Sequence, residues 1–212
     1  MRKQKVVAII QARETSTRFP RKIWADLAGK PVIRWVVDAA QAEGVDSVVV
    51  AAPAELSADP GCPVIVWSGP EDDVLGRYHY AARQTAAGYV VRLTADCPLV
   101  RSSDISKAVV IARAVGLDYV TNVLGRSASE GAGDGFDVEV IAADAIARLA
   151  ESPVLKGPMR EHVTTYIRQH LHEFHVAGFP ASGYSQGKWS IDTEQDLERV
   201  RSLVRQEEMI GT

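Results

Sequence analysis

Short runs of Val and Ile that alternate with amphipathic segments limit the folds open to this chain. A fully apolar run at residues 6–10 is typical of a strand buried on both faces of a parallel sheet. Pro31 suits the first position of a helix, and Gly44 suits its end. Further strands are predicted at residues 46–52, 63–67 and 89–93, and further helices at residues 72–86 and 105–115. The alternation predicts an α/β fold with three layers around a mainly parallel, mixed sheet.

The second half of the chain departs from this rhythm. Two possible strands, at residues 118–122 and 136–141, have no helix between them and are separated by a Gly- and Ser-rich segment, 125–135, which we expect to be a mobile loop. Helices are predicted near residues 144–150 and 158–171 and from Thr193 onward, with strands at residues 173–179 and 188–191. Because no repeat or linker interrupts the pattern, residues 1–212 are expected to form a single domain.

Composition excludes several classes of protein. Lys and Arg number 24 against 27 Asp and Glu, and the net charge of -3 differs from the basic footprint of nucleic-acid-binding proteins. No apolar stretch approaches the roughly 20 residues of a membrane-spanning helix, and the first apolar run is too short for a signal peptide. Cys62 and Cys97 match no zinc spacing and are typical of reduced thiols. We therefore expect a cytoplasmic protein that binds neither nucleic acid nor membrane.

A basic loop follows the first predicted strand. Residues 11–22 carry four cationic side chains, those of Arg13, Arg18, Arg21 and Lys22. α/β proteins bind ligands at the carboxyl ends of their parallel strands, and a triphosphate needs positive charge and close approach of the backbone. The loop could equally be a solvated surface segment, and the residues alone favour neither interpretation. The patterns G-x-x-x-x-G-K-[ST] and G-x-G-x-x-G are absent, which excludes the common P-loop and dinucleotide sites.

Residues 10–31 resemble the signature of the cytidylyltransferases that activate acidic sugars, such as CMP-KDO synthetase, CMP-acylneuraminate synthetase and the spore-coat polysaccharide (SpsF-like) branch. The matching residues are Arg13, Ser16, Arg18, Pro20, Lys22, Gly29, Lys30 and Pro31. The resemblance implies a nucleotide-diphospho-sugar transferase (Rossmann-like) fold, in which this loop holds the phosphates of CTP. The nucleotide-binding residues that it implies are Ala12, Arg13, Ser16, Arg18, Lys22, Ser68, Gly69 and Thr94. Arg13, Lys22 and Asp96 are the implied catalytic residues.

Two positions of the loop depart from the family pattern. Thr15 and Arg21 stand where the family usually has glycine or another small residue. Glycine adopts positive φ at little cost, whereas a residue with a Cβ does not. The departures concern the geometry of the phosphate cradle and leave its excess of positive charge unchanged.

Two aspartates are candidate metal ligands. Asp96 follows a predicted central strand, where a carboxylate can bind Mg²⁺, although an aspartate near a proline is also common in turns. Asp192 precedes the last predicted helix and could cap it instead. Both segments resemble those that hold the metal in the family, which implies one Mg²⁺ bound by Asp96 and Asp192. Mg²⁺ usually takes one or two carboxylates together with phosphate oxygens and water, so two aspartates are the expected number.

Residues 68–78 resemble another stretch of the SpsF-like branch. Ser68 and Gly69 lie at a predicted strand end, where they could meet the base or the ribose. Asp73 and Arg77 follow at helical spacing and could equally form a surface ion pair.

An acceptor site is predicted from later segments. Period-two alternation puts Asp137 and Glu139 on one face of a strand, where they could bind hydroxyls or an amine, although a solvent-facing strand side explains them equally well. His162 lies in a segment that resembles the same branch, but an imidazole on an amphipathic helix is more often packed or capping. The predicted acceptor-binding residues are Asn122, Asp137, Glu139 and His162.

The sequence predicts a Mg²⁺-dependent cytidylyltransferase. An oxygen of an acidic sugar, or of a phosphonate or phosphate, would attack the α-phosphorus of CTP and release pyrophosphate. Two alternatives remain open. One is a transferase of the same fold that uses UTP or GTP, and the other is a non-catalytic or glycosyl-transferring relative that binds a nucleotide-sugar without making it.

Residues 120–180 are also predicted to form a homodimer contact. The helix predicted at 158–171 and the strand predicted at 173–179 have few partners in the regular layers. Four apolar side chains there would be left partly exposed, those of Tyr166, Ile167, Leu171 and Phe174. Exposed apolar patches usually mark an interface, and the family resemblance also implies a dimer.

Overall fold

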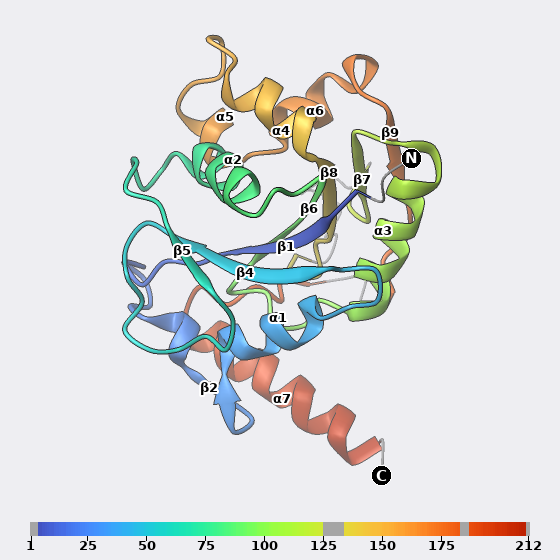
Figure 1. The fold of residues 1–212 in the computed structure, drawn as a ribbon. Helices are drawn as coiled ribbons and strands as arrows, with labels where there is room; N and C mark the ends of the chain where they lie inside the picture. Colours follow the sequence, from blue (N-terminus) through green and yellow to red (C-terminus); the bar gives the residue numbers. More distant parts are fainter. Residues whose placement is uncertain (1–3, 125–133, 183–186, 211–212) are drawn as a thin grey trace.

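The computed structural model describes residues 4–124, 134–182 and 187–210, with side chains as far as residue 206. Most of the Gly- and Ser-rich loop predicted at 125–135 lies outside this part of the chain. Seven strands form one sheet in the order β5-β4-β1-β6-β8-β7-β9 (Figure 1). Their bounds are β1 (Val6–Gln11), β4 (Ser47–Ala52), β5 (Val64–Val66), β6 (Tyr89–Thr94), β7 (Tyr119–Thr121), β8 (Glu139–Ala142) and β9 (Val176–Gly178).

The direction of the strands confirms the predicted mainly parallel, mixed sheet. β8 runs antiparallel to both of its neighbours, β6 and β7. The other neighbouring pairs of this sheet are parallel. Because β1 and β6 are parallel neighbours, with Gln11 opposite Thr94, the loops that follow them leave the same edge of the sheet.

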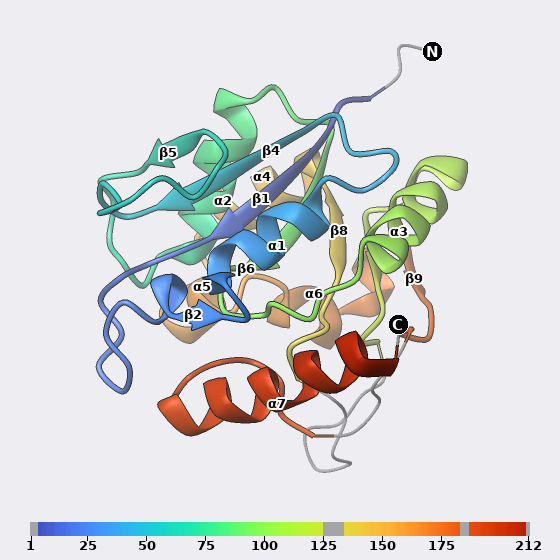
Figure 2. The ribbon, with the colours of Figure 1, turned by 90° about the horizontal axis from the view of Figure 1, so that it is seen from below.

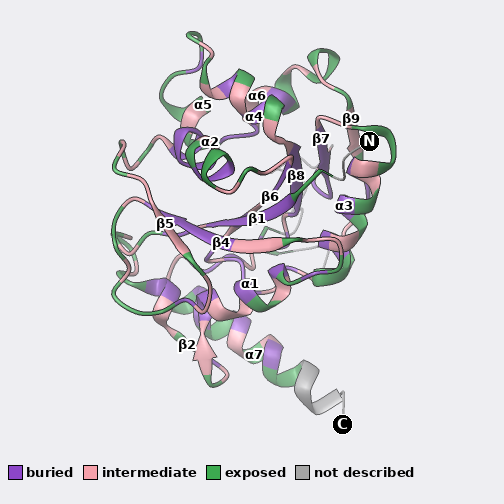
Figure 3. Cartoon of the chain, in the orientation of Figure 1, coloured by how far each residue is buried: buried purple, intermediate pink, exposed green. Residues whose placement is uncertain are grey.

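Helices cover both faces of the sheet. α1 (Val32–Ala40) and α3 (Ser102–Val115) pack on the face that receives Ala8 and Ile10 of β1. α2 (Val74–Gln84) and α4 (Ala143–Ala150) pack on the opposite face, which receives Val7 and Ile9. Successive side chains of a strand point to opposite faces, so one unbroken apolar run supplies both cores. Figure 1 shows the three layers, and Figure 3 shows the buried residues concentrated in the central strands and the helix sides that face them.

The last helix packs against the start of the chain. α7 (Glu194–Ile210) lies beneath α1 and the hairpin of β2 (Asp26–Leu27) and β3 (Lys30–Pro31), as Figure 2 shows. The apolar cluster that joins them consists of Leu27, Val32, Ile191, Leu197, Val200 and Val204. This contact brings the residues just before α7 to the loop that follows β1. Neither α7 nor another helix of the described residues has the length and apolar character needed to cross a membrane.

The helix predicted at 158–171 is broken. The structure has α5 (Pro158–Glu161), α6 (Thr165–Gln169) and a 3-10 helix, η3 (Leu171–Glu173), followed by β9. Between α5 and α6 the chain turns inward, because Val163 is fully buried and Thr164 donates a hydrogen bond to Glu139 at 2.7 Å. Ile167, which was expected to be partly exposed, is fully buried against the α2 and α4 side of the sheet.

Two predicted strands are shorter than expected or missing. The strand predicted at 136–141 begins only at Glu139, because the Asn122 side chain binds the backbone at Phe136 (2.9 Å) and at Val138 (2.9 Å). Residues 188–191 form no strand beyond an isolated bridge between Lys188 and Asp134. Their backbone donors go to separate segments, since Trp189 N donates to Asp134 O and Ile191 N donates to Asp96 O.

Candidate functional site

A polar cavity of about 440 Å³ lies at the carboxyl ends of β1 and β6. Its walls come from the loop after β1, the residues after β6, Glu71 before α2 and Asp192 before α7. The lining residues are Gln11, Ala12, Arg13, Thr15, Ser16, Thr17, Arg18, Lys22, Ile23, Glu71, Thr94, Ala95, Asp96 and Asp192. The cavity therefore lies where adjacent parallel strands end, the usual ligand position in α/β folds.

One ammonium group joins two carboxylates at the edge of this cavity. Lys22, the first residue of the 3-10 helix η1 (Lys22–Trp24), places its Nζ 2.6 Å from Asp96 Oδ2 and 2.9 Å from Asp192 Oδ1. Burial alone would lower the pKa of Lys22, but the two carboxylates raise it above its ordinary value. The Lys22 side chain is 9% exposed, so its charge is balanced mainly by these two acids. We refer to these three residues as the Lys22 cluster.

A second set of cations holds Asp192. Its Oδ2 lies 2.7 Å from Lys188 Nζ and 3.2 Å from an Arg18 guanidinium nitrogen. Although burial opposes ionisation, hydrogen bonds from Lys188 and Lys22 lower the pKa of Asp192 to about 2. Both oxygens of this carboxylate are thus directed at cations.

The capping role considered for Asp192 falls to its neighbours. Thr193 Oγ1 accepts the backbone N–H of Asp196 at 3.2 Å, and Asp196 Oδ2 accepts the backbone N–H of Thr193 at 2.9 Å. This reciprocal pair is a capping box at the start of α7. Asp196 also accepts the backbone N–H of Asp192 at 3.0 Å, which fixes the backbone that carries the Asp192 carboxylate.

Side-chain contacts brace the loop after β1. Glu14 accepts hydrogen bonds from Trp24 Nε1 and from Ser57 Oγ. Arg21 donates its backbone N–H to the Glu14 carbonyl at 3.1 Å and its guanidinium to Ser57 Oγ at 2.9 Å. Arg21 has φ 57°, the left-handed conformation that glycine adopts at little cost. The structure therefore keeps a glycine-like backbone at Arg21 and directs this cation to Ser57.

The predicted nucleotide-binding residues are only partly brought together. Those that line the cavity are Ala12, Arg13, Ser16, Arg18, Lys22 and Thr94. Ser68 and Gly69 do not line it. A Cβ on Gly69 would lie 2.2 Å from the Trp67 ring, so glycine at this position allows the ring to pack against the backbone.

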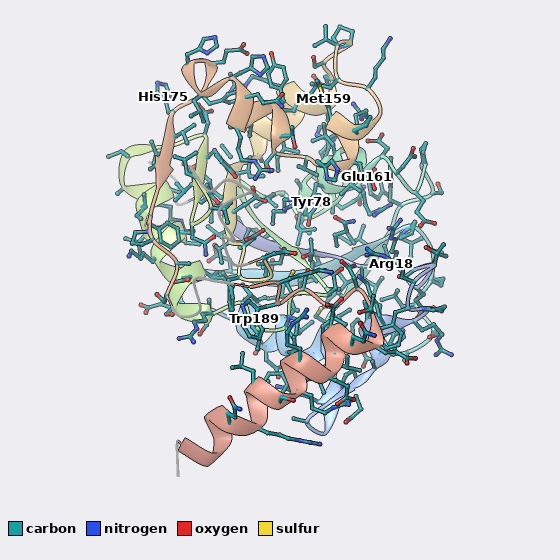
Figure 4. The ribbon with its side chains drawn as sticks, turned by 180° about the vertical axis from the view of Figure 1, so that it is seen from behind. Arg18, Tyr78, Met159, Glu161, His175 and Trp189 are labelled. Atoms are coloured by element: carbon teal, nitrogen blue, oxygen red, sulfur yellow. The ribbon has the colours of Figure 1, made fainter. Side chains whose placement is uncertain are left out.

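The four predicted acceptor-binding residues do not line this cavity. Asn122 is buried and uses its amide to bind backbone, as described above. Asp137 is half-buried before β8, and His162 is exposed at the C-terminal end of α5. Figure 4 shows Glu161, the neighbour of His162, across the sheet from α7, whereas Arg18 lies beside the start of α7. Their acceptor roles remain predictions.

Glu139 has a full set of internal partners. It pairs with Arg92 and accepts hydrogen bonds from Tyr119 and from Thr164. Burial would raise the pKa of this carboxyl, but the Arg92 charge and these hydrogen bonds lower it below its ordinary value. The side chain is 3% exposed, so these contacts give Glu139 a stabilising part in the core.

Comparison with known proteins assigns the family. The family model described as Cytidylyltransferase matches residues 7–209. This chain belongs to the cytidylyltransferase family. It is therefore a nucleotidyltransferase, and the resemblance found in residues 10–31 is confirmed at the level of the family.

Individual members of the family agree over most of the chain. The spore coat polysaccharide biosynthesis protein SpsF of Bacillus subtilis is 26% identical over 212 residues, 93% of this chain and 85% of that protein. A cytidylyltransferase structure from Leptospira borgpetersenii has a TM-score of 0.82 at 26% identity and covers 96% of this chain and 87% of its own. The structure of CMP:2-keto-3-deoxy-manno-octonic acid synthetase complexed with CTP has a TM-score of 0.73 at 21% identity, over 96% and 99% of the two chains. These likenesses confirm the predicted nucleotide-diphospho-sugar transferase fold.

The donor set of the Lys22 cluster fits a divalent cation of the magnesium type. Asp96 and Asp192 contact the same nitrogen, so their oxygens lie within a few ångströms of each other. Among the described residues there is no group of three or more His, Cys, Asp or Glu that could hold a metal. Two carboxylates without a complete protein cage suit Mg²⁺, which usually takes its remaining ligands from phosphates and water.

Several cavity residues were not predicted to have a role. Gln11, Thr15, Thr17 and Glu71 line the cavity, and Lys188 contacts Asp192 from outside it. Thr15 was considered only as a departure from the family pattern of the loop. Glu71 lies in a segment that resembles the SpsF-like branch, but acids just before a helix are common because of the helix dipole, and this gave no reason to single it out.

Proposed function

We propose that this family member transfers the cytidylyl group of CTP, in the presence of Mg²⁺, to an acidic sugar or another acidic acceptor, with release of pyrophosphate. The observation that carries the proposal is the Lys22 cluster, which lies at the edge of a cavity lined by the loop cations Arg13 and Arg18. Two similar proteins support a role in sugar activation. One is a spore coat polysaccharide biosynthesis protein, and the other is a CMP:2-keto-3-deoxy-manno-octonic acid synthetase complexed with CTP. Cys62 and Cys97 are free cysteines, in keeping with a cytoplasmic site of action.

In the proposed reaction an acceptor oxygen attacks the α-phosphorus of CTP. A new oxygen–phosphorus bond forms, and the bond from the α-phosphorus to the bridging oxygen breaks, so that its electron pair leaves with pyrophosphate. Such transfers depend on positioning and on stabilisation of negative charge. Arg13, Arg18 and Lys22 neutralise the triphosphate and the leaving group.

Asp96 and Asp192 would hold the metal. Mg²⁺, when bound, neutralises phosphate charge and polarises the phosphorus that is attacked. The ammonium of Lys22 contacts both aspartates in the protein alone, and it would bind a phosphate oxygen if the metal took its place between them. An acceptor that attacks through an already ionised oxygen needs no general base, and none of the described cavity residues is a histidine.

Pyrophosphate release tests the proposal. The protein is mixed with CTP, Mg²⁺ and a panel of acidic sugars, phosphonates and phosphates. Asp96→Asn and Asp192→Asn are each expected to abolish turnover, and the double variant to be no worse than either, because residues that act as a unit are not additive. Asp38→Asn is the control, since Asp38 forms an exposed pair with Lys30 away from the cavity. Near-normal turnover in a folded Asp96→Asn or Asp192→Asn variant would remove that residue from the site.

We also propose a homodimer formed through residues 120–180. Leu171 and Met159 are 42% and 37% exposed, and Tyr166 stacks on His170. Met159 lies on the side of the sheet away from α7 (Figure 4). Light scattering at tens of micromolar is expected to give the mass of a dimer, and Tyr166→Glu is expected to weaken it. A monomeric mass that Tyr166→Glu leaves unchanged would refute this contact.

A further inference from the structure

Glu71 presents an ionised carboxylate to the cavity. Its Oε1 accepts hydrogen bonds from Thr15 Oγ1 at 2.6 Å and from the Arg13 guanidinium at 3.1 Å. The bond from Thr15, assisted by Arg13 against partial burial, lowers the pKa of Glu71 below its ordinary value. Within the described part of the chain, Oε2 has no hydrogen-bond donor, and the side chain is 40% exposed. One oxygen is thus anchored while the other can accept a hydrogen bond from a ligand.

Hydrogen bonds with α2 and α5 hold the loop that carries Glu71. Arg77 is 1% exposed and donates to the Glu71 backbone carbonyl at 2.6 Å. Asp73 caps α2, because its side chain accepts the backbone N–H of Gly76 at 2.9 Å. The same carboxylate forms a bidentate ion pair with the Arg160 guanidinium, at 2.8 and 2.9 Å. The position of the Glu71 carboxylate is therefore fixed before any ligand arrives, as recognition by a single acceptor requires.

Glu71 and the Lys22 cluster approach the cavity from opposite sides of β1. Glu71 follows β5, whereas Asp96 follows β6, and the sheet order is β5-β4-β1-β6. Three strand spacings separate these two strands, about 14 Å at the usual distance between neighbours. The Glu71 carboxylate spans part of this distance, because it contacts Arg13 and Thr15 in the loop after β1. A nucleotide whose phosphates lie at the Lys22 cluster would therefore extend its base toward the side of Glu71.

We propose that Glu71 recognises the exocyclic amino group of cytosine and so distinguishes CTP from UTP. This inference rests on the proposed function. A carboxylate that shares a cavity with a triphosphate is repelled unless the ligand offers it a donor. Cytosine presents an N4 amino group, for which Asp and Glu are the matching acceptors, whereas uracil presents an O4 acceptor at the same position.

Ribose hydroxyls require no such group. A hydroxyl both donates and accepts, so Thr15, Ser16 and Thr17 in the same wall can satisfy it. The cytosine amino group only donates. Among the described lining residues, Glu71 is the carboxylate that lies outside the Lys22 cluster, and it is the acceptor that suits this donor.

The test is nucleotide binding to Glu71→Gln, measured by calorimetry with Mg²⁺ and without acceptor. The amide N–H of Gln can donate to uracil O4, so the preference for CTP over UTP is expected to fall by roughly ten- to a hundredfold, the range of one base contact. The Gln carbonyl oxygen can still accept the hydrogen bonds from Arg13 and Thr15, and the loss of the ion pair with Arg13 acts equally on CTP and UTP and cancels in the ratio. Asp72→Asn is the matched control, because Asp72 is the next residue of the same loop, is exposed and does not line the cavity.

Glu71→Ala provides the second measurement. It should lower the preference for CTP over UTP by a similar factor, because it removes the acceptor for the cytosine amino group, whereas any effect of releasing Arg13 acts on both nucleotides. The inference is overturned if Glu71→Gln keeps the wild-type ratio, or if Glu71→Ala weakens CTP and UTP equally. In the second case, a comparison of CTP with dCTP shows whether the carboxylate binds the ribose instead. A wild-type protein that binds no nucleotide would refute the proposed function itself, a result distinct from a changed or unchanged ratio.

Discussion

Replacing Lys22 with Met is expected to destabilise the protein in a way that Mg²⁺ reverses. Removal of one partner of a buried ion pair costs roughly 3–5 kcal/mol. Asp96 and Asp192 are 26% and 23% exposed, so water screens part of the charge that the variant leaves behind. We therefore expect the free energy of unfolding to fall by about 2 kcal/mol in the absence of metal. Millimolar Mg²⁺ should recover most of this loss, because a divalent cation can occupy the space between the two carboxylates.

Urea unfolding at neutral pH, with and without MgCl2, measures both effects. Lys30→Met serves as the control. Its pair with Asp38 has side chains that are 36% and 43% exposed, and such pairs contribute about 1 kcal/mol or less. A loss below about 0.5 kcal/mol in Lys22→Met, within the usual effect of a surface substitution, would refute the reasoning about charge. A full loss that Mg²⁺ does not reduce would refute the assignment of the two aspartates to a metal.

Two further predictions concern stability. Arg160→Ala should lower the free energy of unfolding by about 2 kcal/mol, because it removes a bidentate, largely buried ion pair with Asp73. A urea midpoint equal to that of the wild type would contradict this prediction. Glu139→Gln should be less stable than the wild type at neutral pH, and the difference should shrink as the pH falls. The folded-state pKa of Glu139 lies below its ordinary value of 4.5, so its stabilisation is present above that pH and is lost as the pH drops through the folded value. Unfolding curves from pH 7 to pH 3 that keep a constant difference would argue against this pair.

Apolar periodicity predicted the first half of the fold closely. The runs that became β1, β4, β5 and β6 are short and rich in Val and Ile. Amphipathic helices follow β1 and β5, so local pattern and tertiary packing agree. In the second half of the chain, hydrogen bonds made by side chains interrupt the expected strand and helix. Asn122 occupies the backbone of Phe136 and Val138, and Thr164 turns toward Glu139 in the middle of a helical pattern. Periodicity carries no information about such long-range partners.

In the candidate site, too, local pattern did not predict the contacts between residues that are distant in sequence. Asp96 and Asp192 are distant in sequence, and the local pattern gave no reason to assign them to one site. The family resemblance predicted that they share a metal, and the structure shows that both carboxylates contact Lys22. The place of Glu71 in the cavity wall was not predicted, because its partners Arg13 and Thr15 lie in another loop and an acid before a helix is explained locally. Glu139 is a different case, because its period-two position indicated a polar strand face, and the structure shows that Arg92 and Tyr119 contact it there.

The bracing of the loop after β1 has a consequence for the kinetics of binding. Glu14, Trp24 and Ser57 fix this loop, and Arg21 adopts a conformation that glycine would reach with less strain but would also leave more easily. The loop therefore loses its conformational entropy when the protein folds and has little left to lose when a nucleotide arrives. Association with the triphosphate should be a single-exponential process whose rate rises linearly with nucleotide concentration and falls with salt, without the plateau that a slow loop rearrangement would impose.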